Sequence, residues 1–328
     1  MNTKDNQALV LGATGSIGGE LTEALLARGW RVRALTRDPA KAAARTPDLR
    51  IDWIAGDAID AAAVLAAARG AALIVHAVNP PGYHDWDKLV LPWIDNTIAA
   101  AKATGARILL PGTVYNYGPS AGSVVAEDEP QEPVTRKGKL RVQMEQRLRA
   151  AALDGVSSLV VRAGDFFGGR GGGSTWFAAG LVKPGAPLKS VTYPGDAGVG
   201  HGWAYLPDFA LAMAELVERP AAQAFETYHF AGHWDADGTR MIAAIRQAAG
   251  RPDLPRKAFP WAVLTLASPF VTTFRELQEM RYLWREPLRL DNARLVRALG
   301  REPHTPLGEA VARTLQDLGC LERARAAA

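Results

Sequence analysis

Three glycines near the start of the chain, Gly12, Gly15 and Gly18, have the spacing of a loop that binds a pyrophosphate. An apolar run, residues 8–11, precedes them and an amphipathic segment, residues 20–28, follows. Such a loop turns a strand sharply into a helix, whose free N–H groups and positive dipole end attract phosphate. Gly12 is expected to permit the turn, Gly15 the approach of the phosphate, and Gly18 the packing of helix on strand. The side chains between them, expected to lie against the same ligand, are Thr14, Ser16 and Ile17.

The residue after the second strand-like run, residues 31–36, bears on the choice of dinucleotide. A site for NAD usually has an acidic residue there, which accepts hydrogen bonds from the ribose hydroxyls. This chain has Arg37, with Arg33 and Lys41 close in sequence. A guanidinium pairs well with the 2′-phosphate of NADP, which a carboxylate would repel. The sequence therefore favours NADP over NAD, although Arg37 also suits a solvated helix start and Asp38 is near enough to reach a ribose.

Two further strand ends carry side chains suited to the rest of a dinucleotide. Asp57 and Ala58 follow the third strand-like run, where the adenine amino group is expected. Ala77, Val78 and Asn79 close the fourth and offer small side chains and an amide along the cofactor. Because the carboxyl ends of parallel strands share one edge of a sheet, these residues are expected to meet the glycine loop.

Strand-like and helical segments alternate along the first half of the chain. The strand-like runs are 31–36, 51–54, 73–77, 107–110 and 158–161, with helical segments at 61–68, 88–103 and 140–152. This alternation predicts an α/β fold with a Rossmann-like, doubly wound parallel sheet.

After Arg162 the pattern breaks into sequence rich in glycine and proline, and most of the remainder has helical character. We expect residues 1–165 to form the NAD(P)-binding domain, with 201–230 returning to it. Residues 166–200 and 231–328 are expected to form a smaller, mostly helical substrate lobe over the nicotinamide end of the sheet. The crevice between the two is the predicted active site.

Composition excludes several classes of protein. The 328 residues are 48% hydrophobic, enough for a large core, and the net charge of +4 comes with no basic stripe interleaved with aromatics. The single cysteine, Cys320, and an N-terminus without signal-peptide character suit a reducing cytoplasm. We therefore expect a cytoplasmic monomer or homodimer with a small-molecule substrate and neither a nucleic-acid nor a membrane partner. The longest apolar stretch, 259–274, is short for a membrane span and is expected to form a buried helix pair or a subunit contact, with membrane-surface attachment the lesser alternative.

These motifs resemble those of the short-chain dehydrogenase/reductase superfamily, in its extended or atypical branch of epimerase/dehydratase-like proteins. The resemblance spans nearly the whole chain and rests on GATGSIG, the Gly56-Asp57 pair, HAVNPP at the fourth strand and LLPGTVYNYGP at the fifth. RAGDFFGG is similar to the family's segment leading to the substrate lobe, and HGWAYLPDFALAMAELVE to its later strand and Asp-led helix. The resemblance implies the fold and the cofactor much more strongly than it implies the reaction.

The expected active site departs from that family's pattern. Its members carry Ser or Thr at the end of strand five and Tyr-x-x-x-Lys further along. The tyrosine exchanges a proton with the substrate oxygen, while the lysine binds the nicotinamide ribose and lowers the pKa of the tyrosine. Thr113 matches the hydroxyl, but the later segment aligns Lys137 with the tyrosine and Arg141 with the lysine. The usual catalytic tyrosine is absent.

The residues at these positions are still able to do chemistry. Lys137 and Arg141 stand four apart, so on a helix they share a face. A neighbouring cation and partial burial both lower the pKa of an amine, which makes Lys137 a candidate proton donor, with Arg141 holding the ribose. Tyr115 or Tyr117, just past strand five, is the alternative donor. In the plainer interpretation Lys137 and Arg141 form a solvated helix start, and the protein binds its cofactor without turnover.

Substrate contacts are expected from aromatic and polar side chains beyond the strand ends, although the aromatic ones also suit an ordinary core. The candidates are His84, Trp86, Asp165, Phe166, Trp176 and Trp203. Residues 168–174, rich in glycine, are expected to form a lid hinge. No metal site is predicted, because His229, His233, Asp235 and Asp237 follow a strand into a turn and need not converge.

Two classes of function remain. The first is an NADP-dependent oxidoreductase acting on a carbonyl or alcohol of a small, sugar-like or cyclic compound, or an epimerase or dehydratase that uses transient oxidation. The second is a binding protein of the same fold that senses the cofactor without turnover.

Overall fold

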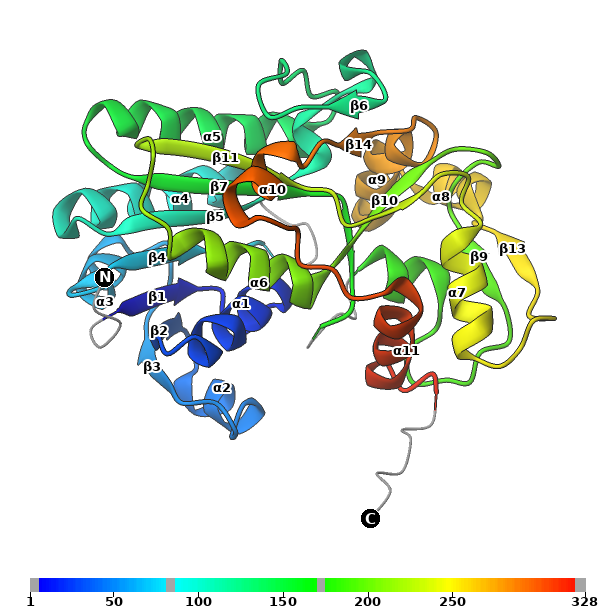
Figure 1. Ribbon diagram of the computed structural model, residues 1–328, viewed down its shortest axis with the longest axis horizontal. Coiled ribbons are helices and arrows are strands. Elements are labelled where there is room, and N and C mark those ends of the chain that lie inside the picture. The colour runs from blue at the N-terminus through cyan, green and yellow to red at the C-terminus, as the bar shows by residue number, and fades with distance from the viewer. Residues whose placement is uncertain (1–5, 81–85, 170–174, 322–328) are drawn as a thin grey trace.

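The computed structural model describes residues 6–80, 86–169 and 175–321, and a seven-stranded sheet runs through their first half (Figure 1). Its strands are β1 (Gln7–Leu11), β2 (Arg31–Thr36), β3 (Ile51–Ala55), β4 (Leu73–His76), β5 (Arg107–Thr113), β7 (Ser158–Ala163) and β11 (Phe225–Phe230). Every neighbouring pair is parallel, in the order β11-β7-β5-β4-β1-β2-β3. This is the predicted doubly wound, Rossmann-like sheet. The strand order reverses at β1 and β4, where such sheets open a crevice at their carboxyl ends.

Helices cover both faces of the sheet, and β1 shows why. Ala8 and Val10 pack with α1 and α6 in one apolar layer, whereas Leu9 and Leu11 pack with α3, α4 and α5 in the other. Successive side chains of a strand point to opposite faces, so a continuous apolar run suits a sheet that is buried on both sides. The covering helices are α1 (Ser16–Ala27), α3 (Ala61–Ala68), α4 (Trp86–Thr104), α5 (Arg136–Leu153) and α6 (Leu206–Val217), with α2 (Pro39–Arg45) and α10 (Ala293–Leu299) near the sheet edges.

A second group of elements forms its own apolar core beside the carboxyl edge of the sheet (right in Figure 1). A three-stranded sheet in the order β12-β10-β8 contributes Phe167 and Trp203 to this core, and α7 and α11 contribute Met241 and Val311. The elements here are β8 (Asp165–Phe167), β9 (Val191–Tyr193), β10 (His201–Tyr205), β12 (His233–Asp235), β13 (Arg256–Ala258), α7 (Arg240–Ala248), α8 (Trp261–Ala267), α9 (Thr272–Glu279), α11 (Leu307–Asp317) and the short turns η6 (Phe177–Leu181) and η7 (Met280–Trp284). Above the sheet lie β6 (Val124–Val125), β14 (Arg289–Leu290), η3 (Val114–Asn116) and η4 (Pro119–Ala121).

The segment 201–230, which was expected to return to the first domain, divides between the two sheets. β10 pairs with β8 and β12 in the smaller sheet. α6 then packs in the same layer as α1, and β11 adds to the edge of the main sheet beside β7. The division of the chain into domains stays a prediction.

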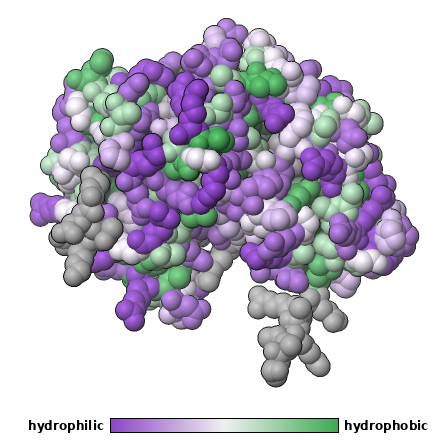
Figure 2. All heavy atoms as spheres, in the orientation of Figure 1, coloured by the Kyte–Doolittle hydropathy of each residue, from purple (hydrophilic) through white to green (hydrophobic). Residues whose placement is uncertain are grey.

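The apolar stretch 259–274 spans α8 and the start of α9. Trp261 and Leu264 are buried, whereas Leu266 and Phe270 are 81% and 90% exposed. The face shown in Figure 2 mixes hydrophilic and hydrophobic side chains, with the hydrophobic ones in small separate groups. Among the described residues, no helix is long and apolar enough to cross a membrane.

Candidate active site

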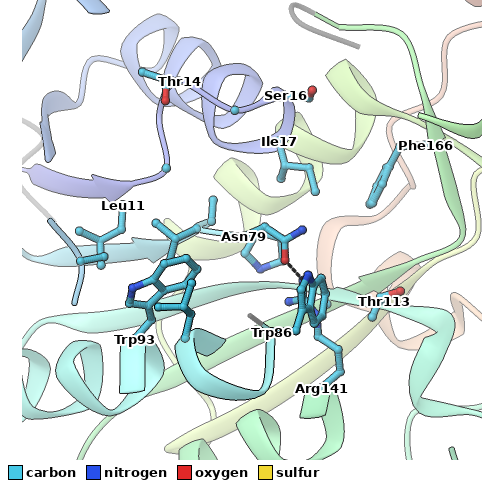
Figure 3. Close-up of a pocket in the computed structure, with 18 of the residues that line it drawn as sticks. Leu11, Thr14, Ser16, Ile17, Asn79, Trp86, Trp93, Thr113, Arg141 and Phe166 are labelled. Atoms are coloured by element: carbon cyan, nitrogen blue, oxygen red, sulfur yellow. Dashed lines mark hydrogen bonds between the residues drawn. The ribbon is translucent and has the colours of Figure 1, made fainter. Parts of the chain in front are cut away.

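A cavity of about 760 Å³ opens at the carboxyl ends of the central strands, where the strand order reverses (Figure 3). Its walls bring together residues from the loops after β1, β2, β3, β4 and β5 and from the start of the smaller sheet. The predicted site residues that line it are Gly12, Thr14, Gly15, Ser16, Ile17, Arg37, Asp57, Ala58, Ala77, Val78, Asn79, Trp86, Thr113, Tyr115, Arg141, Asp165, Phe166 and Trp176.

The glycine loop forms one wall of this cavity. Gly12 has a φ of +92°, and a Cβ there would lie 2.5 Å from the carbonyl oxygen of Ala77. Gly18 faces away from the cavity, and a Cβ on it would lie 2.2 Å from the Gly12 oxygen, so it serves the close packing of helix on strand. The N–H of Gly15 donates to the Gly12 carbonyl at 3.0 Å, and α1 begins at the next residue. The helix therefore starts with its N-terminal N–H groups at the cavity, which suits a phosphate.

Arg37 and Asp57 mark the end of the cavity beside β2 and β3. The Arg37 side chain is 80% exposed, and its Nε lies 4.0 Å from Oδ2 of Asp57. Asp38 caps α2 by accepting the N–H of Lys41 at 3.0 Å, so its carboxylate is occupied by the helix. Arg33 bonds to Asp52 and to two backbone carbonyls instead of facing the cavity.

Arg141, Asn79 and Trp86 meet at the opposite end of the cavity, beside Thr113 (Figure 3). Nη2 of Arg141 donates to Oδ1 of Asn79 at 3.2 Å, and its guanidinium lies 5.4 Å from the centre of the Trp86 ring. The Nε of Arg141 is buried and has no hydrogen-bond partner among the described residues. Behind them burial, helped by the charge of Arg141, lowers the pKa of His76 to about 3 and so keeps that ring neutral. This end of the cavity thus holds the fixed cation of Arg141.

Lys137 begins the same helix but does not line the cavity. It is 1% exposed, and its Nζ lies 3.1 Å from Oε2 of Glu276, a residue of α9 that also binds Arg136. The Lys137 ammonium also donates to the Glu276 carbonyl at 3.3 Å. Burial lowers the pKa of Lys137, while the hydrogen bond and charge of Glu276 oppose that change. This arrangement is a buried ion pair, not the solvated helix start of the plainer interpretation.

The two tyrosines after β5 have different surroundings. Tyr115 lines the cavity, and its backbone N–H donates to the Thr113 hydroxyl at 3.3 Å. Tyr117 is fully buried outside the cavity, where its hydroxyl meets Nη1 of Arg162 at 2.8 Å and Nε2 of His229 at 3.0 Å. Burial raises the pKa of Tyr117. Of the two tyrosines, Tyr115 is the one that lines the cavity.

Asp165, Phe166 and Trp176 line the end of the cavity beside Thr113, called the substrate end because the sequence predicts substrate contacts there, and Phe166 lies across it from Trp86 and Thr113 (Figure 3). Trp203 is 1% exposed and packs inside the smaller lobe, 6.4 Å from Phe167. His84 lies outside the described residues, as does most of the glycine-rich segment 168–174.

Sequence reasoning missed His201, whose Nε2 lies 3.0 Å from Oδ2 of Asp165. Its position at the head of the HGWAYLPDF motif was a signal that could have found it. The described residues contain no group of three or more His, Cys, Asp or Glu side chains arranged to hold a metal ion.

Comparison with known proteins agrees with this geometry. Residues 12–169 match a family model described as NAD(P)H-binding. The chain is 30% identical over 266 residues to a 3-diazoavenalumate denitrifying reductase of a Streptomyces species, which covers 73% of this chain and 84% of that protein. It is 29% identical over 131 residues to a ceramide reductase of Caulobacter vibrioides, covering 39% of this chain and 41% of the relative.

A solved structure shares the fold over nearly the full length. The UDP-glucuronic acid 4-epimerase of Bacillus cereus, in complex with NAD, matches with a TM-score of 0.74 at 17% identity, covering 98% of this chain and 99% of that chain. The glycine loop, the parallel sheet and these matches agree with the resemblance seen in the sequence. The chain belongs to the NAD(P)H-binding family of that model, in agreement with its resemblance to the short-chain dehydrogenase/reductase superfamily, and it has the fold of the epimerase.

Proposed function

We propose that this protein is an NADP-dependent oxidoreductase that reduces a carbonyl group of a small molecule, or oxidises the corresponding alcohol, by hydride transfer. The main support for this proposal is that a single cavity joins the predicted phosphate site to the predicted substrate site. Its walls include both the phosphate-binding loop at Gly15 and the Thr113 hydroxyl at the substrate end. A ligand that fills it therefore reaches from an anion site to a polar group able to hold a substrate oxygen.

The residues present fit a dinucleotide. The close approach of backbone at Gly12 leaves no room for a side chain, and the start of α1 offers its N–H groups to a pyrophosphate. Asn79 and Arg141, which are hydrogen-bonded to each other at the cavity wall, are proposed to hold the nicotinamide ribose. When bound, the nicotinamide supplies or accepts the hydride.

The NADP preference rests on Arg37. Its guanidinium is exposed at the cavity wall and is held only loosely by Asp57, at 4.0 Å. Asp38, the acidic residue that would otherwise serve a ribose, caps α2. A 2′-phosphate would therefore meet a cation with its donors available.

Reduction is preferred to epimerisation or dehydration because the relative that covers most of this chain is named a reductase. Thr113 is proposed to bind the substrate oxygen, while Phe166, Trp176 and Trp86 enclose an apolar group. That Lys137 is the proton donor stays a prediction. Because Lys137 is paired with Glu276 and does not line the cavity, a donor among the residues that do line it is also considered below.

The second candidate function, a cofactor-sensing protein without turnover, is favoured by one observation. The position of the family's catalytic tyrosine holds Lys137, and the charge of that lysine is already paired with Glu276.

One experiment separates the two functions. The full-length protein is titrated with NADPH and with NADH by cofactor fluorescence, and NADPH oxidation is then followed with 4-nitrobenzaldehyde, phenanthrenequinone and cyclohexanone. Tight NADPH binding with oxidation of at least one probe supports the oxidoreductase. Tight binding without oxidation of any carbonyl favours the sensor, and weak binding of both cofactors contradicts both functions.

A further inference from the structure

We propose that Asp165 and His201 form a net-neutral acid pair that holds one dissociable proton at the substrate end of the cavity and delivers it to the substrate oxygen. The delivery step rests on the proposed oxidoreductase function, whereas the existence of the shared proton does not. The pair would do the work of the tyrosine that this chain lacks.

Hydrogen-bond geometry fixes the number of protons in the pair. Nδ1 of His201 lies 3.2 Å from the backbone oxygen of Leu283, which can only accept, so Nδ1 carries a hydrogen. Nε2 lies 3.0 Å from Oδ2 of Asp165, and this contact also needs one hydrogen between the two atoms. That proton sits either on an imidazolium facing a carboxylate or on a carboxylic acid facing a neutral ring. Both forms are neutral overall and hold one proton to give.

The surroundings of the pair favour keeping this proton. Asp165 and His201 are 5% and 6% exposed, and an unpaired carboxylate at such a site is costly. The His201 ring stacks on Trp284 with a centroid distance of 3.8 Å and an interplanar angle of 8°. This stacking fixes the plane of the ring and keeps Nε2 directed at Asp165.

The pair stands next to the proposed substrate oxygen. Thr113, at the end of β5, pairs in register with Ala163 of β7, and Asp165 follows two residues later at the start of β8. Asp165 and Thr113 both line the cavity, whereas Lys137 and Tyr117 do not. Asp165 is thus the member of the pair that lines the cavity, and its carboxyl group is the one proposed to meet a substrate held by Thr113.

In the direction of reduction, the substrate carbonyl gains one hydride and one proton. The carbonyl carbon gains a hydride from the reduced cofactor, and its oxygen gains the proton of Asp165. Rotation of the carboxyl group about its Cβ–Cγ bond turns the protonated oxygen from His201 to the substrate. The products are an alcohol, an Asp165 carboxylate and a neutral His201 whose Nδ1–H stays bonded to Leu283, and a proton from solvent restores the pair.

Among the residues that the structure describes, Tyr193, Tyr282 and Asp235 are the titratable neighbours to consider. Burial raises the pKa of Tyr193 and of Tyr282, and the negative charge of Asp165 adds to both shifts. Asp235 pairs in register with His201 across β10 and β12, but its carboxylate accepts the backbone N–H groups of Arg240 and Met241 at 3.1 and 2.9 Å. None of these three groups is therefore expected to take the shared proton from Asp165 and His201.

The proton itself is tested without any substrate. Besides the His229 ring, whose nitrogens bond to Val125 and to Tyr117 and Arg162, nitrogen-15 NMR of histidine-labelled protein at pH 7 should show one ring with both nitrogens protonated or strongly hydrogen-bonded. This signal should vanish in His201→Gln and persist in His304→Gln, a matched change at an exposed histidine outside the cavity. A His201 ring with a plain, unprotonated Nε2 overturns the proposal.

Delivery of the proton is tested with Asp165→Asn, whose amide can still donate to Nε2 of His201 but has no acid to give. We expect kcat for 4-nitrobenzaldehyde, or for another probe that the wild type reduces, to fall about 10²–10⁴-fold. The melting temperature and the NADPH dissociation constant should stay close to wild type. A variant with wild-type kcat, or with a changed KM alone, overturns delivery. A wild-type protein that binds NADPH but reduces no probe contradicts the proposed function and delivery together, while NMR still decides the shared proton.

Discussion

The phosphate end of the cavity is formed mainly by backbone groups, whereas the substrate end is formed mainly by side chains. The phosphate end is made by backbone within one short segment: Gly12 turns the chain, Gly18 packs the helix, and α1 presents its N–H groups. The substrate end is lined by side chains from segments far apart in the sequence, such as Thr113, Asp165 and Trp176, and some of these are held from behind by distant partners, as Asp165 is by His201. The first depends on local geometry, whereas the second depends on tertiary contacts that come from the whole C-terminal part of the chain.

The largest effect is expected from cutting one of those tertiary contacts. Glu276→Gln leaves the buried Lys137 without its ion-pair partner, which should cost about 3–5 kcal/mol of unfolding free energy. Urea unfolding measures this loss. NADPH binding by the folded fraction should change little, because the conformation of the glycine loop depends on local backbone contacts and not on Glu276.

The double variant Lys137→Met with Glu276→Leu is the control for that experiment. Replacing a buried ion pair by apolar side chains is often neutral, so most of the stability should return. If the double variant also keeps its turnover, Lys137 is an anchor for α9. A stable double variant with no turnover would instead support Lys137 as the proton donor.

A smaller effect is expected at the phosphate end. Arg37→Ala should remove most of the preference for NADP over NAD, and the change should be seen only in NADP affinity. A hydrogen bond to a charged group contributes about 1.5–3 kcal/mol, and Arg37 is 80% exposed, so we expect the low end, roughly tenfold. Fluorescence titration with both cofactors gives the ratio. Equal NAD and NADP affinity in the wild type would contradict the assignment, and Lys41→Ala is the matched control on the neighbouring helix.

The last effect depends on pH and is close to zero at pH 7. Burial lowers the pKa of His76 and of His229 to about 3, from an ordinary value near 6.5. Between these values the unfolded chain binds protons that the folded chain does not, so stability falls as the pH drops below about 6.5. Each histidine contributes a slope of about 1.4 kcal/mol per pH unit in that window. Urea unfolding at pH 7, 6 and 5 should show the fall, and His76→Asn, which can keep the bond to Thr97, should show a shallower one. An identical slope in both proteins would rule out His76 as a source.

The fold and the phosphate end could be predicted from sequence because their causes are local. The apolar run before Gly12 and the period of the following helix specify β1 and α1 without reference to any distant residue. The same holds for Arg37 and Asn79, since a residue just past a parallel strand must lie at the carboxyl edge of the sheet.

The substrate end could not be predicted in the same way. Lys137 and Arg141 were expected to share a helix face, yet Arg141 lines the cavity and Lys137 turns to Glu276, more than a hundred residues away. Tyr115 and Tyr117 are two residues apart, yet one faces the cavity and the other is bonded to Arg162. Such differences depend on which partner the fold brings near, and a single sequence carries no local signal of that.

The ion pair between Lys137 and Glu276 has a consequence for the evolution of such chains. Proteins with this fold diversify by changing the segments that cover a common nucleotide-binding half. Here Glu276 of α9 and Lys137 of α5 form a buried, charge-matched pair between the predicted NAD(P)-binding domain and the predicted substrate lobe. A chimaera that joined residues 1–165 to a foreign covering segment would inherit an ammonium without its carboxylate. Recombination that replaces the covering segment is therefore expected to succeed only when the residues at positions 137 and 276 are replaced together.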